Sequence, residues 1–78
     1  MQQGRNWTVR IEKRVKSALI YRDLTEHIYV LAAQGKGAED FCKKNWPDWE
    51  IKEVRQENPP QGSWVLLAPD ALGEVRGI

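Results

Sequence analysis

Hydrophobic and polar residues alternate along residues 7–15, near the start of the chain. The apolar positions of one parity are Trp7, Val9, Ile11 and Val15, and the other parity holds threonine and charged residues. Successive side chains of a β-strand point to opposite faces of the sheet. The alternation therefore predicts a strand with one buried face and one solvated face.

The next apolar stretch, residues 18–33, is interrupted by four residues that are mostly polar. We interpret it as a strand over 18–22, a turn over 23–26 and a strand over 27–33, because the last part is rich in β-branched and aromatic residues. A helix is the competing interpretation, since four apolar residues also recur at helical spacing without an intervening glycine or proline. These residues are Ile20, Leu24, Ile28 and Leu31.

An amphipathic helix is predicted after the glycines at 35 and 37. Its apolar side comprises Ala38, Phe41, Cys42 and Trp46, and Pro47 ends it. A strand over 49–56 follows, in which Ile51 and Val54 are three apart, so we expect a bulge or an early end there.

The remaining residues contain a turn over 58–62, a largely buried strand over 63–68 and a loose tail over 69–78. The order strand, strand, strand, helix, strand, strand predicts an α+β fold, with a small, mostly antiparallel sheet and one short helix packed on a face. A chain of 78 residues fits a single domain, with an ordered core over residues 6–68.

Cysteine content and hydropathy indicate the compartment. Cys42 is the only cysteine, so the chain has no internal disulfide and suits a reducing environment. The amino terminus has no apolar leader, and no stretch approaches the roughly 18 apolar residues that span a bilayer. We therefore expect a cytoplasmic protein without a membrane segment.

Catalytic and metal-binding groups are scarce in the sequence. His27 is the only histidine, and neither it nor Cys42 has partners at the spacing of a zinc site. Gly35–Gly37 precedes a helix as phosphate-binding loops do, but it lacks the Gly-Lys-Ser/Thr ending. We expect no cofactor, no metal and no enzymatic activity.

Charge is unevenly distributed although its sum is only +1. Residues 1–22 carry a net charge of +5 and residues 23–78 one of −4. The solvated face of the first strand displays Arg10 and Arg14, and a hairpin with the second strand is expected to bring Lys16 and Arg22 close to them.

The four tryptophans offer further contact surface. Trp7 and Trp64 share the parity of apolar strand residues, so we assign them to the core. Trp46 and Trp49 flank a helix-to-strand corner, where we expect one ring to be partly exposed. Exposed tryptophan is enriched at binding hot spots.

The sequence thus predicts a non-enzymatic protein-binding module, such as an adaptor, a regulator or a phage or mobile-element inhibitor of a host system. The alternative is a nucleic-acid-binding domain that uses the basic face of the first strand. The identity of the partner and the oligomeric state stay open. The expected partner-binding residues are Arg10, Arg14, Lys16, Arg22, Trp46 and Trp49.

Overall fold

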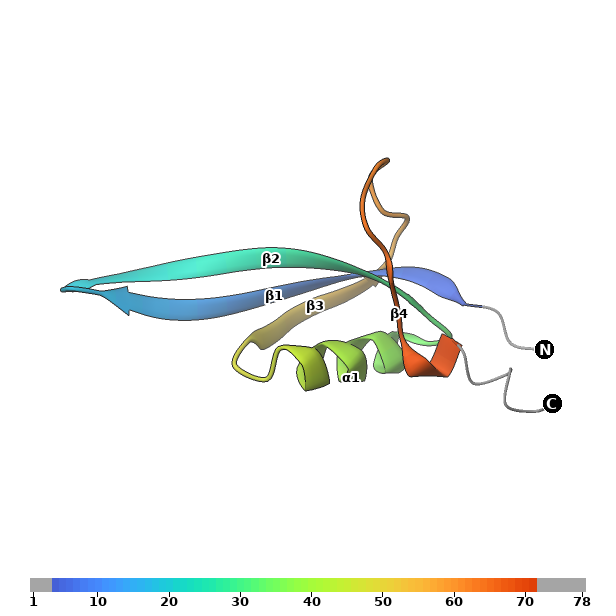
Figure 1. Ribbon diagram of the computed structural model, residues 1–78, viewed down its shortest axis with the longest axis horizontal. Coiled ribbons are helices and arrows are strands. Elements are labelled where there is room, and N and C mark those ends of the chain that lie inside the picture. Colours follow the sequence, from blue (N-terminus) through green and yellow to red (C-terminus); the bar gives the residue numbers. More distant parts are fainter. Residues whose placement is uncertain (1–3, 72–78) are drawn as a thin grey trace.

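The computed structural model describes residues 4–71 of the chain. Two long strands come first, then a helix, two further strands and a short 3₁₀ helix (Figure 1). The elements are β1 (Arg5–Ser17), β2 (Ile20–Ala32), α1 (Gly35–Asn45), β3 (Glu50–Gln56), β4 (Leu66–Leu67) and the 3₁₀ helix η1 (Pro69–Ala71).

The strands form one mixed sheet in the order β3-β1-β2-β4. Strand β1 pairs antiparallel with both β2 and β3, whereas β4 runs parallel to β2. The helix α1 packs against one face of this sheet (Figure 1). The α+β class with one helix on a sheet is confirmed, and the parallel β4 is a difference in detail. Among residues 4–71, no helix is long and apolar enough to cross a membrane.

Residues 20–32 form one uninterrupted strand, which corrects the interpretation of this stretch. The turn predicted at residues 23–26 is wrong, and so is the competing helix, because every residue from Ile20 to Ala32 pairs with β1 without a register shift. The polar residues here do not break the strand because they lie on a hairpin that is exposed on both faces. The order therefore has one strand fewer before the helix than expected.

The hairpin turn consists of Ala18 and Leu19, between paired Ser17 and Ile20. Ala18 has φ = 55°, in the left-handed region that favours glycine. Two-residue hairpin turns are normally recognised by glycine or asparagine. This turn has neither, so its position is hidden in the sequence.

Replacing Ala18 with glycine is expected to stabilise the protein by about 0.5–1 kcal/mol, because glycine adopts a positive φ without the steric penalty of a Cβ atom. Urea denaturation of both proteins measures the difference. Ser17→Gly is the control, since Ser17 has no positive φ, and we expect it to destabilise. A loss of stability in Ala18→Gly would contradict the assigned turn.

The core lies between the sheet and α1. Its largest fully buried side chains are Val9 and Ile11 of β1, Val30 of β2 and Cys42 of α1. Trp7 packs against this cluster and its indole Nε1 donates a hydrogen bond to the carbonyl oxygen of Ala32 at 3.0 Å. The odd-numbered face of β1 is thus the one that packs on the core, as its alternation predicts. Thr8 is an exception on the other face: it is only 6% exposed, although its parity predicts a solvated side chain.

Strand β3 carries the expected bulge. Arg10 pairs with Glu53, but the next residue of β1, Ile11, pairs with Ile51, so β3 has one residue more at this point. The extra residue brings Ile51 onto the same face as Val54, and both pack against the core.

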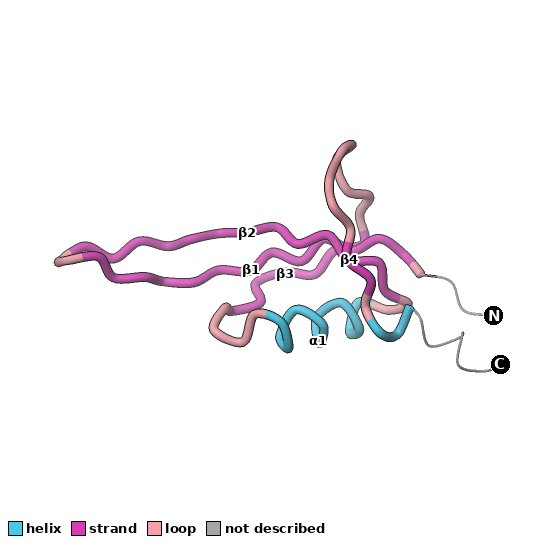
Figure 2. Tube along the Cα trace, viewed as in Figure 1, coloured by secondary structure: helices cyan, strands magenta, loops and turns pink. Residues whose placement is uncertain are grey.

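The segment after β3 differs most from expectation. Only Leu66 and Leu67 of the predicted strand over 63–68 pair with β2, and the preceding residues form a loop that stands away from the body (Figure 2). Residues 69–71, assigned to a loose tail, form η1, and Ala71 is buried. The rest of that predicted tail, residues 72–78, lies outside the described residues.

Asp70 of η1 holds the start of α1. Its Oδ1 accepts a hydrogen bond from the backbone N–H of Ala33 at 3.0 Å, and its Oδ2 accepts one from Gln34 at 3.3 Å. A Cβ atom at Gly37 would collide with this carboxylate. The glycine therefore allows Asp70 to approach the first turn of a helix that has no acidic residue of its own there.

Candidate protein-binding surface

The hairpin of β1 and β2 extends well beyond the rest of the molecule (Figures 1 and 2). Pairing with β3 stops at Glu12, which lies opposite Glu50. In the described structure, residues 13–24 are therefore a two-stranded ribbon without a third strand, and we call this ribbon the arm. The arm makes the molecule elongated, with extents of 55, 25 and 17 Å.

The tip of the arm is apolar and solvated. Leu19 is 91% exposed, and Ile20 and Tyr21 are 64% and 62% exposed. Among residues 4–71, no core lies within reach of these side chains, because α1 and β3 cover only the other end of the hairpin (Figure 1). Exposed apolar groups gathered on a projecting element are typical of a contact surface.

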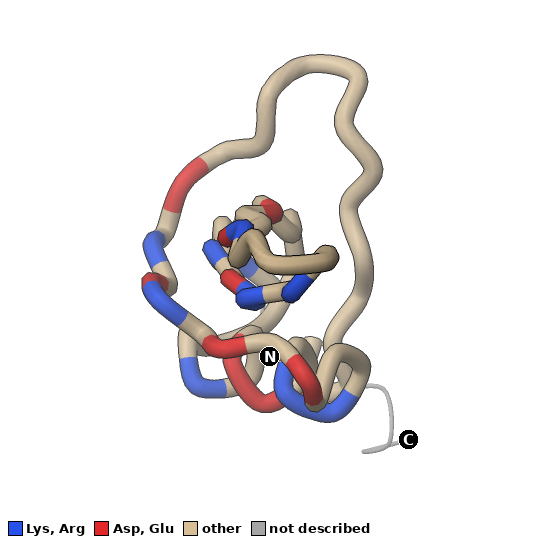
Figure 3. The backbone as a smooth tube through the Cα atoms, turned by 90° about the vertical axis from the view of Figure 1, so that its left-hand side faces the viewer, with Lys and Arg blue, Asp and Glu red and all other residues tan. Residues whose placement is uncertain are grey.

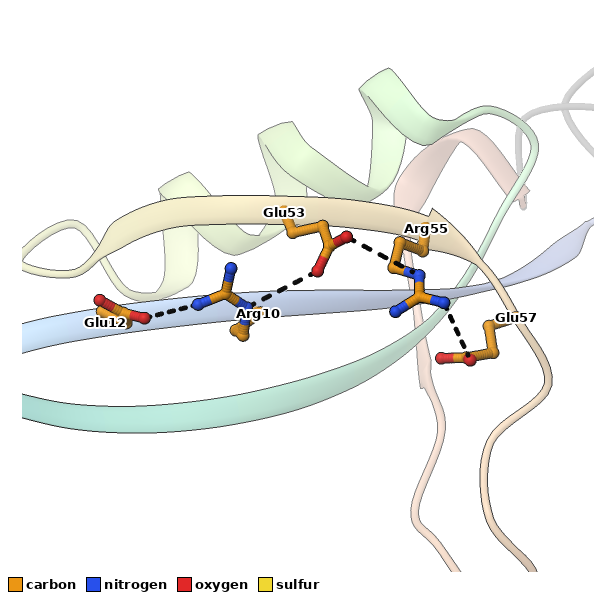
Figure 4. Close-up of polar contacts among 5 residues, drawn as sticks. All are labelled: Arg10, Glu12, Glu53, Arg55 and Glu57. Atoms are coloured by element: carbon orange, nitrogen blue, oxygen red, sulfur yellow. Dashed lines mark hydrogen bonds and ion pairs between the residues drawn. The ribbon is translucent and has the colours of Figure 1, made fainter.

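Arg10 lies on the face of the sheet opposite α1, as expected, but acidic groups surround it. Its Nη1 lies 2.6 Å from Oε2 of Glu12, and its Nε lies 3.6 Å from Oε1 of Glu53. Arg55 continues the row, with its Nε 3.8 Å from Glu53 and its Nη2 3.7 Å from Glu57 (Figure 4). The row has three carboxylates for two guanidinium groups, so it is not a basic patch.

Arg14 is also paired. Its Nε lies 2.9 Å from Oδ1 of Asp23, the residue directly opposite on β2. The hydrogen bond and the guanidinium charge lower the pKa of Asp23, and Asp23 in turn raises the pKa of Arg14. The charge of Arg14 is thus balanced on its own face.

Lys16 and Arg22 do not join the two arginines in a single patch. Lys16 lies on the same face as Arg14, with its Nζ 5.6 Å from the centre of the Tyr21 ring. Arg22 is directly opposite Val15, so it projects from the other face. The expected cluster of four basic residues is therefore wrong in two respects: acids neutralise part of it, and the strand alternation divides the rest.

The assignment of tryptophans from parity is right for Trp7, which packs against the core, and wrong for Trp64. Trp46 and Trp49 are both half-buried against the core, and Trp46 meets Phe41 edge to face, with ring centroids 6.4 Å apart. Trp64, assigned to the core, is 89% exposed. Parity predicts burial only inside a paired strand, and Trp64 precedes the two residues that pair.

An apolar cavity of about 310 Å³ lies beside β2 at the base of the uncharged loop that Figure 3 shows in tan. Its lining includes Trp64 and Leu66 from the loop and β4, Ile28 and Tyr29 from β2, and Trp46. Sequence reasoning missed this cavity because its walls come from segments far apart in the chain. The one sequence signal for this cavity is the absence of charged residues from the segment around Trp64, residues 58–69.

The candidate chemical groups are dispersed. Burial raises the pKa of the Cys42 thiol to about 11, so the thiol stays protonated at neutral pH. His27 is exposed on β2, and the described residues contain no group of three or more His, Cys, Asp or Glu side chains placed to hold a metal ion. At the start of α1, the carboxylate of Asp70 lies against Gly37, where a phosphate would need to approach.

Comparisons with known proteins give no relative from which a role can be carried over. No protein-family model, no curated protein and no solved structure matches this chain.

Proposed function

We propose that this protein is a non-enzymatic protein-binding module whose main contact element is the arm. The observation that carries this proposal is the apolar tip, Leu19 to Tyr21, which lies at the end of a ribbon that packs on no core within residues 4–71. A projecting hairpin fits into a groove or lies along a strand of another protein, and apolar anchors supply most of the binding energy in such contacts. Adaptors, regulators and stoichiometric inhibitors all work in this way.

Charge pairing supports a protein partner over a nucleic acid. Phosphate binding relies on cations that are free to replace counterions. Arg10, Arg14 and Arg55 are each already engaged with carboxylates. Three cations of the arm make no ion pair within the described part of the chain: Lys13, Lys16 and Arg22. They are the observation that favours the alternative, in which the arm binds nucleic acid.

Replacing Leu19 with aspartate is expected to reduce partner binding by about tenfold or more, because a charge at the tip has to be desolvated in an apolar contact. The measurement is affinity capture from the native host after nuclease treatment, with the retained protein quantified for each variant. Gln61→Asp is the matched control: it adds the same charge at an exposed site on the loop, and we expect it to retain the partner as the wild type does.

Two results would contradict the proposal. Equal retention by Leu19→Asp and wild type would show that the arm is not the contact element. Retention of nucleic acid that disappears at moderate salt, with no retained protein, would favour the nucleic-acid alternative, because phosphate contacts weaken steeply with ionic strength.

A further inference from the structure

We infer that the partner of the arm is a second copy of this chain, which pairs antiparallel with the free edge of β2 and has Leu24 on the two-fold axis. This inference rests on the proposed function and specifies its partner. Three features carry it: the hydrogen-bonding groups of the edge, the sequence symmetry of residues 20–28, and the apolar surfaces at the two ends of that segment.

The free edge of β2 presents unpaired backbone groups. Strand β4 pairs only with Val30 and Leu31, so residues 20–28 have no paired strand on that side in the described structure. The N–H of Ala68 donates to the carbonyl of Leu31 at 2.9 Å, so the backbone of Leu31 faces away from β1. Antiparallel strands alternate in this respect, and the outward groups nearer the tip are those of Tyr21, Asp23, Thr25 and His27.

This edge lacks several of the usual protections against strand addition. Exposed edges are normally blocked by charged side chains, especially lysine, by proline, by a bulge or by a covering segment. The charges on this edge are Arg22, Asp23 and Glu26; they are of both signs, so they repel a second copy only in registers that bring like charges together. Residues 20–28 contain no lysine and no proline, and their pairing with β1 shows no register shift. A regular edge of this length with no strand paired to it is a template for another strand.

The sequence of the edge is self-complementary when Leu24 lies on the axis. A two-fold axis perpendicular to the sheet places Arg22 opposite Glu26 of the second copy, and the reverse pair forms on the other side of the axis. Leu24 meets its own copy, and Ile20 lies opposite Ile28.

On the other face Asp23 lies opposite Thr25, whose hydroxyl is a donor. No like charges are opposed.

Other symmetric registers are poorer. An axis at Asp23 or at Glu26 places two identical carboxylates directly opposite each other, which is destabilising. An axis at Thr25 places Glu26 opposite Leu24 and Arg22 opposite Ile28, so that both ion pairs are lost. Like every register with its axis on a residue, the one centred on Leu24 aligns the outward backbone groups: Tyr21 lies opposite His27, and each faces outward.

The same register brings the two exposed apolar surfaces together. With Ile20 of one copy beside Ile28 of the other, the tip reaches the cavity that Ile28, Tyr29 and Trp64 line. Leu19 and Trp64 are the most exposed large apolar residues of the described chain, at 91% and 89%. They lie at opposite ends of the edge. In the symmetric dimer, Leu19 of each copy lies near Trp64 of the other, so both residues of both copies become covered.

The first experiment is a charge exchange, read by sedimentation over a concentration series. We expect the wild type to dimerise. Arg22→Glu alone and Glu26→Arg alone should each raise the dimer dissociation constant by about tenfold or more, since each creates two like-charge contacts. The double variant, which restores both pairs with reversed signs, should return towards the wild-type value. Failure of the double variant to recover would overturn the register.

The second experiment is a cross-link at the axis. Leu24→Cys should form a disulfide-linked dimer on mild oxidation, because facing non-hydrogen-bonded residues have Cβ atoms about 4.5–5.5 Å apart. Lys13→Cys is the matched control: Lys13 lies opposite Leu24 on β1, three strand spacings or about 14 Å from its own copy, and should not cross-link. Native Cys42 is buried. Equal cross-linking of both variants would overturn the placement of the axis.

The same experiments distinguish an error about the dimer from an error about the binding role of the arm. A wild type that remains monomeric throughout the concentration series, but still captures a different protein that Leu19→Asp loses, would overturn the second copy as partner and leave the binding role of the arm intact. A monomer whose captured partners are indifferent to Leu19→Asp would overturn both.

Discussion

Replacing Ile11 with alanine is expected to lower the free energy of unfolding by about 3–5 kcal/mol. Ile11 is 1% exposed and lies on β1, an inner strand of the sheet, opposite Glu26 of β2 and Ile51 of β3. Removal of three methyl or methylene carbons leaves a cavity beneath α1. Strands on both sides hold the backbone of β1 in place, so the surroundings cannot close this cavity easily.

Val15→Ala is the matched control for Ile11→Ala. Val15 lies on the same face of the same strand, but it is on the arm and outside the core cluster. We expect a loss below about 1 kcal/mol, as for a partly exposed strand residue. Urea denaturation followed by tryptophan fluorescence measures both variants. Similar losses at the two positions would contradict the boundary between body and arm.

Replacing Asp70 with alanine is expected to destabilise the protein by about 2–3 kcal/mol, because two backbone N–H groups lose a charged acceptor. Those groups, on Ala33 and Gln34, lie at the junction of β2 and α1. The carboxylate also lies at the amino-terminal end of α1, where negative charge is favourable. A loss of helical signal should accompany the fall in stability.

Asp70→Asn tests how much of this effect depends on charge. The amide keeps an oxygen that can accept one of the two hydrogen bonds, so we expect about half the loss of Asp70→Ala. Circular dichroism and urea denaturation give the two readouts. An alanine variant as stable as the wild type would show that η1 does not hold the start of the helix.

Sequence patterns predicted the elements whose signal is local. The alternation of β1 and the helical spacing of Ala38 and Cys42 identified a strand and a helix, and the spacing of Ile51 and Val54 identified the bulge. The hairpin turn escaped because Ala18 adopts a conformation that its residue type disfavours. The polar residues from Asp23 to Glu26 carry a stronger turn signal than Ala18 and Leu19, although they lie within a continuous strand.

The surface was harder to predict than the fold. The outward direction of Arg10 and Arg14 follows from strand alternation alone. The acids that neutralise them do not, because Glu53 and Asp23 become neighbours only through the strand register. Trp64 was misplaced for a related reason: its burial depended on a pairing that begins only at Leu66.

The length of the arm can change without a change in the core that stabilises the fold. In the part of the chain that the structure describes, residues 13–24 pair only with one another, so the packing of the core does not fix how many residues the arm contains. Inserting two residues into each strand would lengthen the arm by about 7 Å and keep every side chain on its face, whereas a single insertion in one strand would exchange the faces beyond it. The distance spanned by this protein can therefore change over evolution in steps of one pleat, while the domain that carries the arm stays the same.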